Sequence, residues 1–336
     1  MTIAVCILNY NGAAFLAKYI PFLLKTTYTN VQFFIIDNNS TDNSKAVAQT
    51  FEPAIIWLPL NQNYGYAGGY NQGLKTINAH VYVLLNSDVE VTPNWLQPIA
   101  NLFKTNSKIA AIQPKILQIA NRNYFEYAGA AGGYLDTFGY PFCRGRIFNN
   151  CEKDTGQYNT ATPIMWASGA CLAIRASAFN AVQGFDARFF AHMEEVDLCW
   201  RMQRAGYLIY AEPTAEVYHV GGGTLPTGSY KKAYLNFRNN HYMLLKNAPI
   251  FKLMWLLPLR FALDALAAYH ALFFKKDIVF FKAIFMAHLA VLGFVFSKKN
   301  TVKLPRQMPK NGFYKSSIVY SFFIKKINTF YKLNMP

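Results

Sequence analysis

The sequence predicts an α/β protein with a doubly wound, mostly parallel mixed sheet, followed by a basic helical region. Two observations predict it. Short apolar runs alternate with helical patterns in the first hundred residues, and the excess positive charge lies in the last third. Residues 1–230 contain 15 Lys/Arg and 15 Asp/Glu, whereas residues 231–336 contain 18 basic and two acidic residues. The net charge of +16 therefore indicates a neutral body with a cationic tail, not a uniformly basic nucleic-acid binder.

The first hundred residues predict the main elements of the sheet. Strand-like runs occupy residues 3–8, 31–36, 55–58 and 81–85, and helical patterns occupy 13–24 and 45–51, with a third helix ending at 74–78. Strands that alternate with helices at this spacing favour a parallel sheet, and such sheets bind ligands outside the carboxyl ends of their strands. The polar stretches 9–11, 37–39 and 86–88 fall at those ends, so we expect a ligand site there.

The middle of the chain is less regular. Residues 164–174 are typical of a further strand, 194–205 have helical spacing, and 208–211 with 215–218 predict a short interrupted strand. The five cysteines lack CxxC spacing, which indicates neither a zinc knuckle nor a disulfide framework. A reducing cytoplasm is the simplest interpretation of that pattern.

Two long apolar segments follow, at residues 251–274 and 278–296. The second has about the length of a membrane span, but Lys282 and His288 interrupt it. In the first, Arg260 and Asp264 are one helical turn apart and can pair. We expect amphipathic helices in the cytoplasmic membrane interface, with flanking Lys and Arg on anionic headgroups. The alternatives are a hairpin that dips into or crosses the bilayer and a soluble helical cap.

Two motifs suit an anionic ligand. Asp88 directly follows an apolar strand, where a carboxylate can hold a divalent cation, although an Asp that caps the next helix looks the same. Residues 61–71 form a glycine-rich turn that enters a helix, and backbone amides in such a turn can cradle a diphosphate. The glycines lack the spacing of a dinucleotide fingerprint.

A second pair of features suits catalysis. Glu194, Glu195 and Asp197 begin a predicted helix, where carboxylates complement the helix dipole, but one of them can also act as a general base. His219 precedes the glycine run 221–223, and it is either structural or a metal ligand.

Read together, these segments resemble the family 2 glycosyltransferases with the GT-A fold, especially their bacterial rhamnosyltransferase-like branch. The resemblance covers about residues 2–246. The matching motifs, in chain order, lie at residues 7–12, 36–40, 63–65, 85–88, 168–170, 184–190, 194–201 and 219–224.

The resemblance implies an inverting transfer of a sugar from a nucleotide diphosphate-sugar, UDP- or dTDP-linked, to an acceptor hydroxyl. Asp88 would hold Mg²⁺ or Mn²⁺ with His219 as a further ligand, and Glu195 would be the base. The residues implied in donor binding are Asn9, Tyr10, Asp37, Asn39, Asn63, Gly65, Asn86 and Asp88. Those implied on the acceptor side are Trp166, Gly169 and Asp186.

The sequence departs from the family pattern at two positions. Asn86 stands where the family often has the first carboxylate of its metal motif, which leaves Asp88 as the main charged ligand. Glu195 stands where the usual base is Asp, so Glu194 and Asp197 remain alternative bases.

We therefore expect a glycosyltransferase domain over residues 1–245 and a basic, aromatic, membrane-associating helical region over residues 246–336. The expected activity adds a sugar to a lipid-linked precursor of a cell-surface polysaccharide at the cytoplasmic face of the inner membrane, with peripheral or monotopic attachment. No recognition motif supports a nucleic-acid partner. The rival hypotheses are a polyprenyl-phosphate sugar synthase and an inactive glycan-binding subunit with the same fold.

Overall fold

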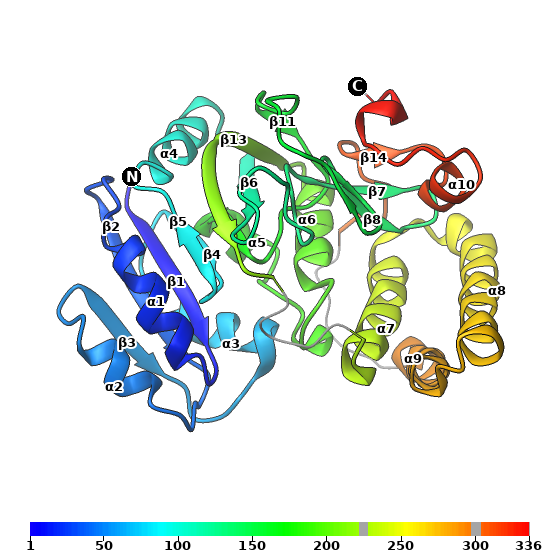
Figure 1. The fold of residues 1–336 in the computed structure, drawn as a ribbon, viewed down its shortest axis with the longest axis horizontal. Coiled ribbons are helices and arrows are strands. Elements are labelled where there is room, and N and C mark those ends of the chain that lie inside the picture. Colours follow the sequence, from blue (N-terminus) through cyan, green and yellow to red (C-terminus); the bar gives the residue numbers. More distant parts are fainter. Residues whose placement is uncertain (222–227, 297–303, 336) are drawn as a thin grey trace.

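The computed structural model describes residues 1–221, 228–296 and 304–335, and it contains a mixed sheet at the centre of the N-terminal body (Figure 1). The strand order is β11-β13-β6-β12-β4-β1-β2-β3, with β5 paired to β13. The neighbouring parallel strands are β1 (Ile3–Asn9), β2 (Val31–Asp37), β3 (Ile55–Pro59) and β4 (Val81–Leu85). The predicted α/β class and the mixed sheet are confirmed.

The other half of the sheet mixes strand directions. Its strands are β5 (Val89–Val91), β6 (Ile109–Gln118), β11 (Thr162–Pro163), β12 (Cys171–Arg175) and β13 (Leu208–His219). Strand β12 runs antiparallel to β4 and β6, whereas β13 runs parallel to β6 through an irregularity at 212–216. Of the expected strand at 164–174, only residues 171–174 form a strand, as part of β12. The expected interrupted strand at 208–218 is one bent strand.

Helices pack on both faces of the sheet because their apolar sides face two separate cores. Helices α1 (Ala13–Leu23), α2 (Ser44–Gln49) and α4 (Leu96–Thr105) contribute to one core. Helices α3 (Gly65–Gly73), α5 (Ala176–Ala181) and α6 (Glu194–Arg204) contribute to the other. This doubly wound arrangement leaves the carboxyl ends of the parallel strands open for a ligand.

A second, smaller sheet is built partly from the end of the chain. Its strands are β7 (Gly133–Asp136), β8 (Pro141–Cys143), β9 (Arg146–Ile147), β10 (Asn150–Cys151) and β14 (Phe313–Tyr314). Strand β14 pairs in parallel with β7, and Phe330 packs against Tyr134 with ring centroids 4.7 Å apart. Helix α10 (Ile318–Phe323) follows β14. The expected region 246–336 is therefore not one helical unit, because its last part returns to the body.

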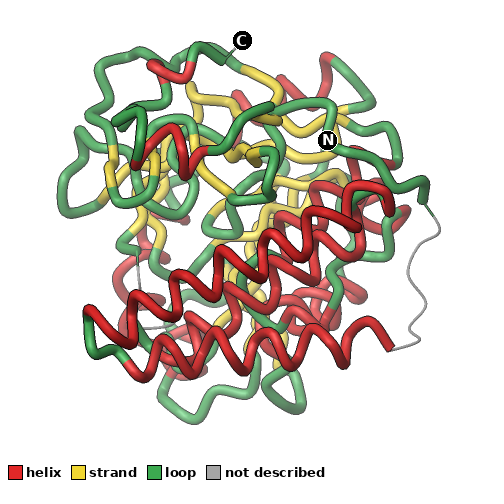
Figure 2. The backbone as a smooth tube through the Cα atoms, turned by 90° about the vertical axis from the view of Figure 1, so that its right-hand side faces the viewer, coloured by secondary structure: helices red, strands yellow, loops and turns green. Residues whose placement is uncertain are grey.

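Three long helices follow the main sheet along the chain. They are α7 (Tyr230–Asn247), α8 (Ile250–Phe274) and α9 (Ile278–Phe296). Figure 2 shows them side by side along one side of the molecule, where α9 packs against both α7 and α8. Among the residues that the structure describes, no helix is both long enough and apolar enough for a membrane span.

Candidate active site

A cleft of about 260 Å³ opens at the carboxyl ends of β1, β2 and β4, at the edge where the sequence predicts a ligand site. Its wall combines backbone and side chains from the strand ends, from the turn before α3, from the turn before α6 and from α7. The lining residues are Leu8, Tyr10, Asn11, Gly12, Phe15, Asn38, Asn63, Gly65, Tyr66, Asn86, Ser87, Asp88, Phe190, Ala191 and Lys231.

The predicted nucleoside contacts divide into lining and supporting residues. Tyr10 lines the cleft and is 53% exposed. Asn9 and Asp37 are buried behind it: Asn9 Nδ2 donates to Asp37 Oδ1 at 3.2 Å and to Ser40 Oγ at 3.0 Å. Asn39 is exposed and does not line the cleft. Asn9 and Asp37 thus hold the two strand ends together.

The glycine-rich turn is held by Asn38, which sequence reasoning missed although it lies between two candidate residues. Asn38 Nδ2 donates to Asn63 Oδ1 at 3.0 Å and to the Gly65 carbonyl at 3.1 Å, while its Oδ1 accepts from the Tyr64 amide at 2.9 Å. Gly65 has φ +70°, and a Cβ there would lie 2.6 Å from the Phe190 ring. Only glycine fits this turn without a rearrangement.

The same turn does not offer its amides to a diphosphate, which corrects the prediction. The amide of Gly65 donates to Asn63 Oδ1 at 2.9 Å, and the amides of Tyr66 and Ala67 donate to the Phe190 carbonyl at 2.8 and 3.3 Å. With the Tyr64 amide bonded to Asn38, the start of α3 is already satisfied within the protein. Asn63 and Gly65 shape the cleft instead.

Asp88, His219 and Glu126 form a buried cluster at the cleft. Strand β13 pairs with β5 so that His219 lies opposite Val89, directly beside Asp88. His219 Nε2 is 3.2 Å from Asp88 Oδ1, and its Nδ1 is 3.4 Å from Glu126 Oε2. Glu126 gave no sequence signal, because it follows an irregular turn that brings it back beside β6.

The electrostatics of this cluster favour a cation. Burial alone would lower the pKa of His219, but the adjacent carboxylates of Asp88 and Glu126 raise it to about 10. The two carboxylates thus favour a proton on the imidazole, and a metal ion bound at Nε2 would take the place of that proton. A carboxylate at the cleft wall, a histidine beside it and a second carboxylate on the far ring nitrogen are a donor set that fits Mg²⁺ or Mn²⁺. Asn86, also in the lining, offers an amide oxygen.

The first turn of α6 carries the candidate bases. Phe190, His192 and Met193 have φ values of +66°, +69° and +68°, so the backbone turns sharply just before Glu194. Asn239 Nδ2 donates to the carbonyls of Phe189, Ala191 and His192 at 2.9, 2.8 and 2.7 Å. These bonds stabilise a strained turn of the kind found at functional sites.

Glu194 is buried, and Glu195 is half-buried. Burial raises the pKa of Glu195 to about 7, and burial together with the neighbouring Glu195 charge raises that of Glu194 well above its usual range. One Oε2 atom of each is buried without a hydrogen-bond partner among the described residues. Neither glutamate lines the cleft, but the adjacent Tyr66 does. Burial raises the pKa of Tyr66 most, and the charges of Tyr70, Glu194 and Glu195 raise it further.

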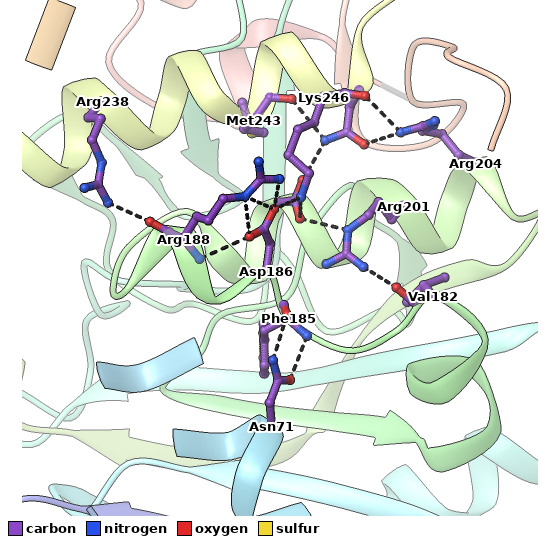
Figure 3. A network of polar contacts seen from close by, with 12 residues as sticks. Asn71, Val182, Phe185, Asp186, Arg188, Arg201, Arg204, Arg238, Met243 and Lys246 are labelled. Carbon is purple, nitrogen blue, oxygen red and sulfur yellow. Dashed lines mark hydrogen bonds and ion pairs between the residues drawn. The ribbon is translucent and has the colours of Figure 1, made fainter. Parts of the chain in front are cut away.

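Asp186 belongs to the network of polar contacts shown in Figure 3, and Asp197 joins it through Lys246. Asp197 accepts from Arg201 Nε, Lys246 Nζ and Asn247 Nδ2, each at 2.8 Å. Asp186 pairs with Arg188 and with Lys246, whose Nζ is 2.8 Å from Asp186 Oδ2.

The network fixes the charge of both aspartates. Burial opposes ionisation, but Arg201 and Lys246 hold the pKa of Asp197 below its usual range, and Arg188 and Lys246 do the same for Asp186. Every oxygen of Asp197 is engaged by a cation or an amide. Asp197 lies on α6 and Asp186 directly precedes the turn 187–189, and Lys246 of α7 binds both carboxylates. Both carboxylates therefore hold α7 to the body, which leaves neither open to act as a base or to contact an acceptor.

The two other acceptor-side predictions have different outcomes. Trp166 is 4% exposed, and its Nε1 donates to the Tyr134 carbonyl at 3.0 Å, so its side chain lies in the core and not in the cleft lining. The Gly169 carbonyl accepts from the Tyr66 hydroxyl at 2.8 Å, which keeps Gly169 next to the cleft wall.

Lys231 is a further lining residue that sequence reasoning missed. It lies in the first turn of α7, with its Nζ 4.7 Å from the Phe190 ring centroid. Because it belongs to a basic, aromatic stretch, the sequence suggested only a cationic tail. Its position instead brings a positive charge to the cleft, where an anionic ligand gains from it.

Comparisons with known proteins agree with this architecture. Two solved structures have a similar fold. GalNAc-T7 with UDP, GalNAc and Mn²⁺ superposes with a TM-score of 0.54 at 17% identity, covering 70% of this chain and 48% of that one. The mannosyltransferase PcManGT from Pyrobaculum calidifontis, in complex with GDP-Man and Mn²⁺, gives a TM-score of 0.53 at 12% identity, covering 86% of each chain.

The sequence comparisons are more specific. An N-acetylglucosaminyl-diphospho-decaprenol L-rhamnosyltransferase of Mycobacterium tuberculosis is 26% identical over 225 residues, which are 63% of this chain and 73% of that protein. The model of the family described as "Glycosyl transferase family 2" matches residues 4–182, more than half of the chain. The predicted resemblance is confirmed, and the chain belongs to glycosyl transferase family 2.

Proposed function

We propose that this chain moves a sugar from a nucleotide diphosphate-sugar to a hydroxyl of a glycan acceptor, with inversion at the anomeric carbon. The observation that carries the proposal is the buried Asp88–His219–Glu126 cluster at the wall of a cleft outside the parallel strands. The name of the mycobacterial relative supports an acceptor carried on a polyprenyl diphosphate, in the synthesis of a cell-surface polysaccharide.

The donor's diphosphate is the group that the cluster would serve. Asp88 and His219 would hold Mg²⁺ or Mn²⁺, and Glu126 would orient the imidazole through its other nitrogen. The bound ion neutralises the negative charge that grows on the diphosphate leaving group. Lys231 faces the same cleft and would contribute a further positive charge.

Glu195 is the base in this proposal. It would take the proton of the acceptor hydroxyl while that oxygen bonds to the anomeric carbon, and the nucleoside diphosphate would leave with the electrons of the broken C–O bond. A pKa of about 7 lets a carboxylate be ionised in a useful fraction yet basic enough to accept the proton. Burial and the neighbouring Glu195 charge also raise the pKa of Glu194, which is the alternative base.

A nucleotide-sugar screen tests the proposal directly. With Mn²⁺ present, a UDP- or dTDP-sugar should raise the Tm of the full-length protein, because a ligand at 100 times its Kd stabilises the folded state by about 2.7 kcal/mol. The same nucleotide sugar without metal should raise the Tm less. GDP-sugars, tested in the same way, show whether the protein distinguishes the base of the donor. If no nucleotide sugar changes the Tm with or without Mn²⁺, the proposed donor class is wrong.

We further propose that α8 and α9 dock on the cytoplasmic surface of an anionic membrane. Large apolar side chains stand exposed along both helices and far exceed the scattered apolar exposure of an ordinary surface. They include Phe251, Met254, Trp255, Leu266, Tyr269, Phe273, Phe274, Ile278, Phe285, Leu289 and Leu292. Lys275, Lys276 and Lys282 are exposed beside them. An apolar surface flanked by lysines is typical of a helix pair that lies in the headgroup region.

Vesicle sedimentation tests this docking. The full chain should sediment with vesicles that contain phosphatidylglycerol, less with neutral vesicles and less at high salt. Lys275→Glu with Lys276→Glu should weaken binding by about 30-fold, since each lysine near the surface contributes about 1 kcal/mol. Tyr127→Glu, an exposed position in the body, is the matched control and should bind normally. Equal sedimentation of the double variant and the control would contradict the docking surface.

A further inference from the structure

His241, Asp264 and His288 form a cluster of metal-ligating side chains that the reaction does not use. They come from three different helices, α7, α8 and α9. His241 Nε2 is 3.6 Å and His288 Nε2 is 3.5 Å from the same atom, Asp264 Oδ2. The three ligand atoms all lie within 4.8 Å of one another, and none of the three residues lines the active-site cleft.

The hydrogen bond of His241 fixes which ring nitrogen can bind a ligand. Its Nδ1 is 2.9 Å from the Phe237 carbonyl, and a carbonyl can only accept, so Nδ1 carries the proton. In the neutral ring, Nε2 then has a free lone pair.

The free nitrogen faces a negative oxygen. His241 is 0% exposed, and its Nε2 has no hydrogen-bond partner among the described residues, although Asp264 Oδ2 lies 3.6 Å away. A lone pair and a carboxylate oxygen that face each other inside a protein repel, and an unpaired buried polar atom is costly. A cation between them would satisfy both atoms.

Arg260 does not fill this role, because it faces the other side of the carboxylate. Its Nη2 is 3.9 Å from Asp264 Oδ1, its Nη1 donates to the Phe138 carbonyl at 2.8 Å, and its guanidinium lies 3.8 Å from the Tyr140 ring centroid. Asp264 Oδ2 therefore remains directed at the two imidazoles.

We propose that His241, Asp264 and His288 bind a Zn²⁺ ion that joins α7, α8 and α9. Two imidazoles and one carboxylate are a common ligand set for zinc, and tetrahedral ligands about 2.05 Å from the ion lie roughly 3.4 Å apart. Two of the three pairs are already close to that spacing. The Phe237 carbonyl supplies the outer hydrogen bond that orients a zinc-bound histidine.

The site also has an entrance. A cleft of about 290 Å³ between α8 and α9 is lined by His288, whose side chain is 20% exposed. An ion and a water molecule in the fourth position can enter from this side. The inference does not depend on the proposed sugar transfer, because it concerns different residues and a different metal chemistry.

Zinc retention tests the inference. After incubation of the full-length protein with excess Zn²⁺ and desalting, elemental analysis should find one zinc per chain less in His241→Ala and in His288→Ala than in the wild type. His270→Ala removes an exposed histidine of α8 and is the matched control. It should retain the wild-type amount. When Asp88→Ala is added to both variants, His288→Ala should still retain one zinc per chain less than His270→Ala. This result separates the proposed zinc site from the active site.

A second readout removes the effect of any folding defect. Zn²⁺ should raise the Tm of the wild type and of His270→Ala, but not that of His288→Ala, whose partly exposed side chain can be truncated without disturbing the core. Equal zinc content in His288→Ala and His270→Ala would overturn the inference. So would an equal Zn²⁺-dependent rise in Tm in the two variants, or a wild type that retains no zinc.

Discussion

Glu195→Gln is expected to lower kcat for sugar transfer by about 10²–10⁴-fold, the usual contribution of a general base. Glutamine keeps the shape and polarity of the side chain but cannot accept the proton of the acceptor hydroxyl. Because Glu195 lies outside the cleft that would hold the donor, the KM for the nucleotide sugar should stay nearly constant. Initial-rate kinetics at saturating donor separate the two parameters.

The pH dependence of the same reaction provides an independent readout. A base works only when deprotonated, so a pKa raised to about 7 makes kcat rise with pH and level off above neutrality. In Glu195→Gln the residual rate should be flat over this range. A profile that keeps its rise in the variant would assign the titration to another group.

Glu194→Gln is the matched control, since it makes the same change at the adjacent residue. Glutamine keeps the shape of the Glu194 side chain and removes only its capacity to accept a proton, which the proposed reaction does not use. Activity should remain within a few-fold of the wild type. The reverse ranking would make Glu194 the base, and full activity in both variants would favour a phosphate acceptor, which needs no strong base.

Asp88→Ala is expected to lower the metal-dependent rate of sugar transfer by about 10³-fold, because a divalent ion stabilises the charge of the transition state by several kcal/mol. The variant loses the carboxylate that faces the cleft, and His219 loses its Nε2 partner. Mn²⁺ binding, followed by the loss of the free-ion electron paramagnetic resonance signal, should weaken in parallel. Rate and binding together distinguish a ligand from a structural residue.

Two further variants sharpen this experiment. Glu52→Ala removes an exposed carboxylate outside the cleft and should leave Mn²⁺ affinity unchanged. Glu126→Gln keeps the shape of the side chain that orients His219 and should weaken Mn²⁺ binding about 10–100-fold, as changes behind a ligating histidine do. Unchanged Mn²⁺ affinity in Asp88→Ala would show that this cluster is not the metal site.

The sequence predicts the parallel half of the sheet well, because apolar runs and turns alternate there with little interruption. Asp88 and His219 could be predicted as candidate metal ligands for the same reason, since each lies at the end of an apolar strand. Their contact depends on the antiparallel pairing of β13 with β5, and the sequence contains no local sign of that pairing.

The errors have a common physical origin. The glycine-rich turn suits a diphosphate by composition, but its amides are taken by Asn63 of the same turn and by Asn38 and Phe190, which come from two distant segments. Asp197 looks like a base until Lys246 of α7 lies against it. Partners that meet only through the tertiary fold decide whether a polar group is available, and such partners are invisible to periodicity and spacing.

The pairing of β14 with β7 has a consequence for how the chain matures. Leu135 donates its amide to Gly312 at 3.0 Å, and Trp200 Nε1 donates to the Gln307 carbonyl at 2.8 Å, so residues near the C-terminus complete structures begun much earlier. During synthesis on the ribosome, the apolar helices α8 and α9 emerge before the strand that closes the small sheet. The small sheet therefore stays incomplete until both apolar helices have been made.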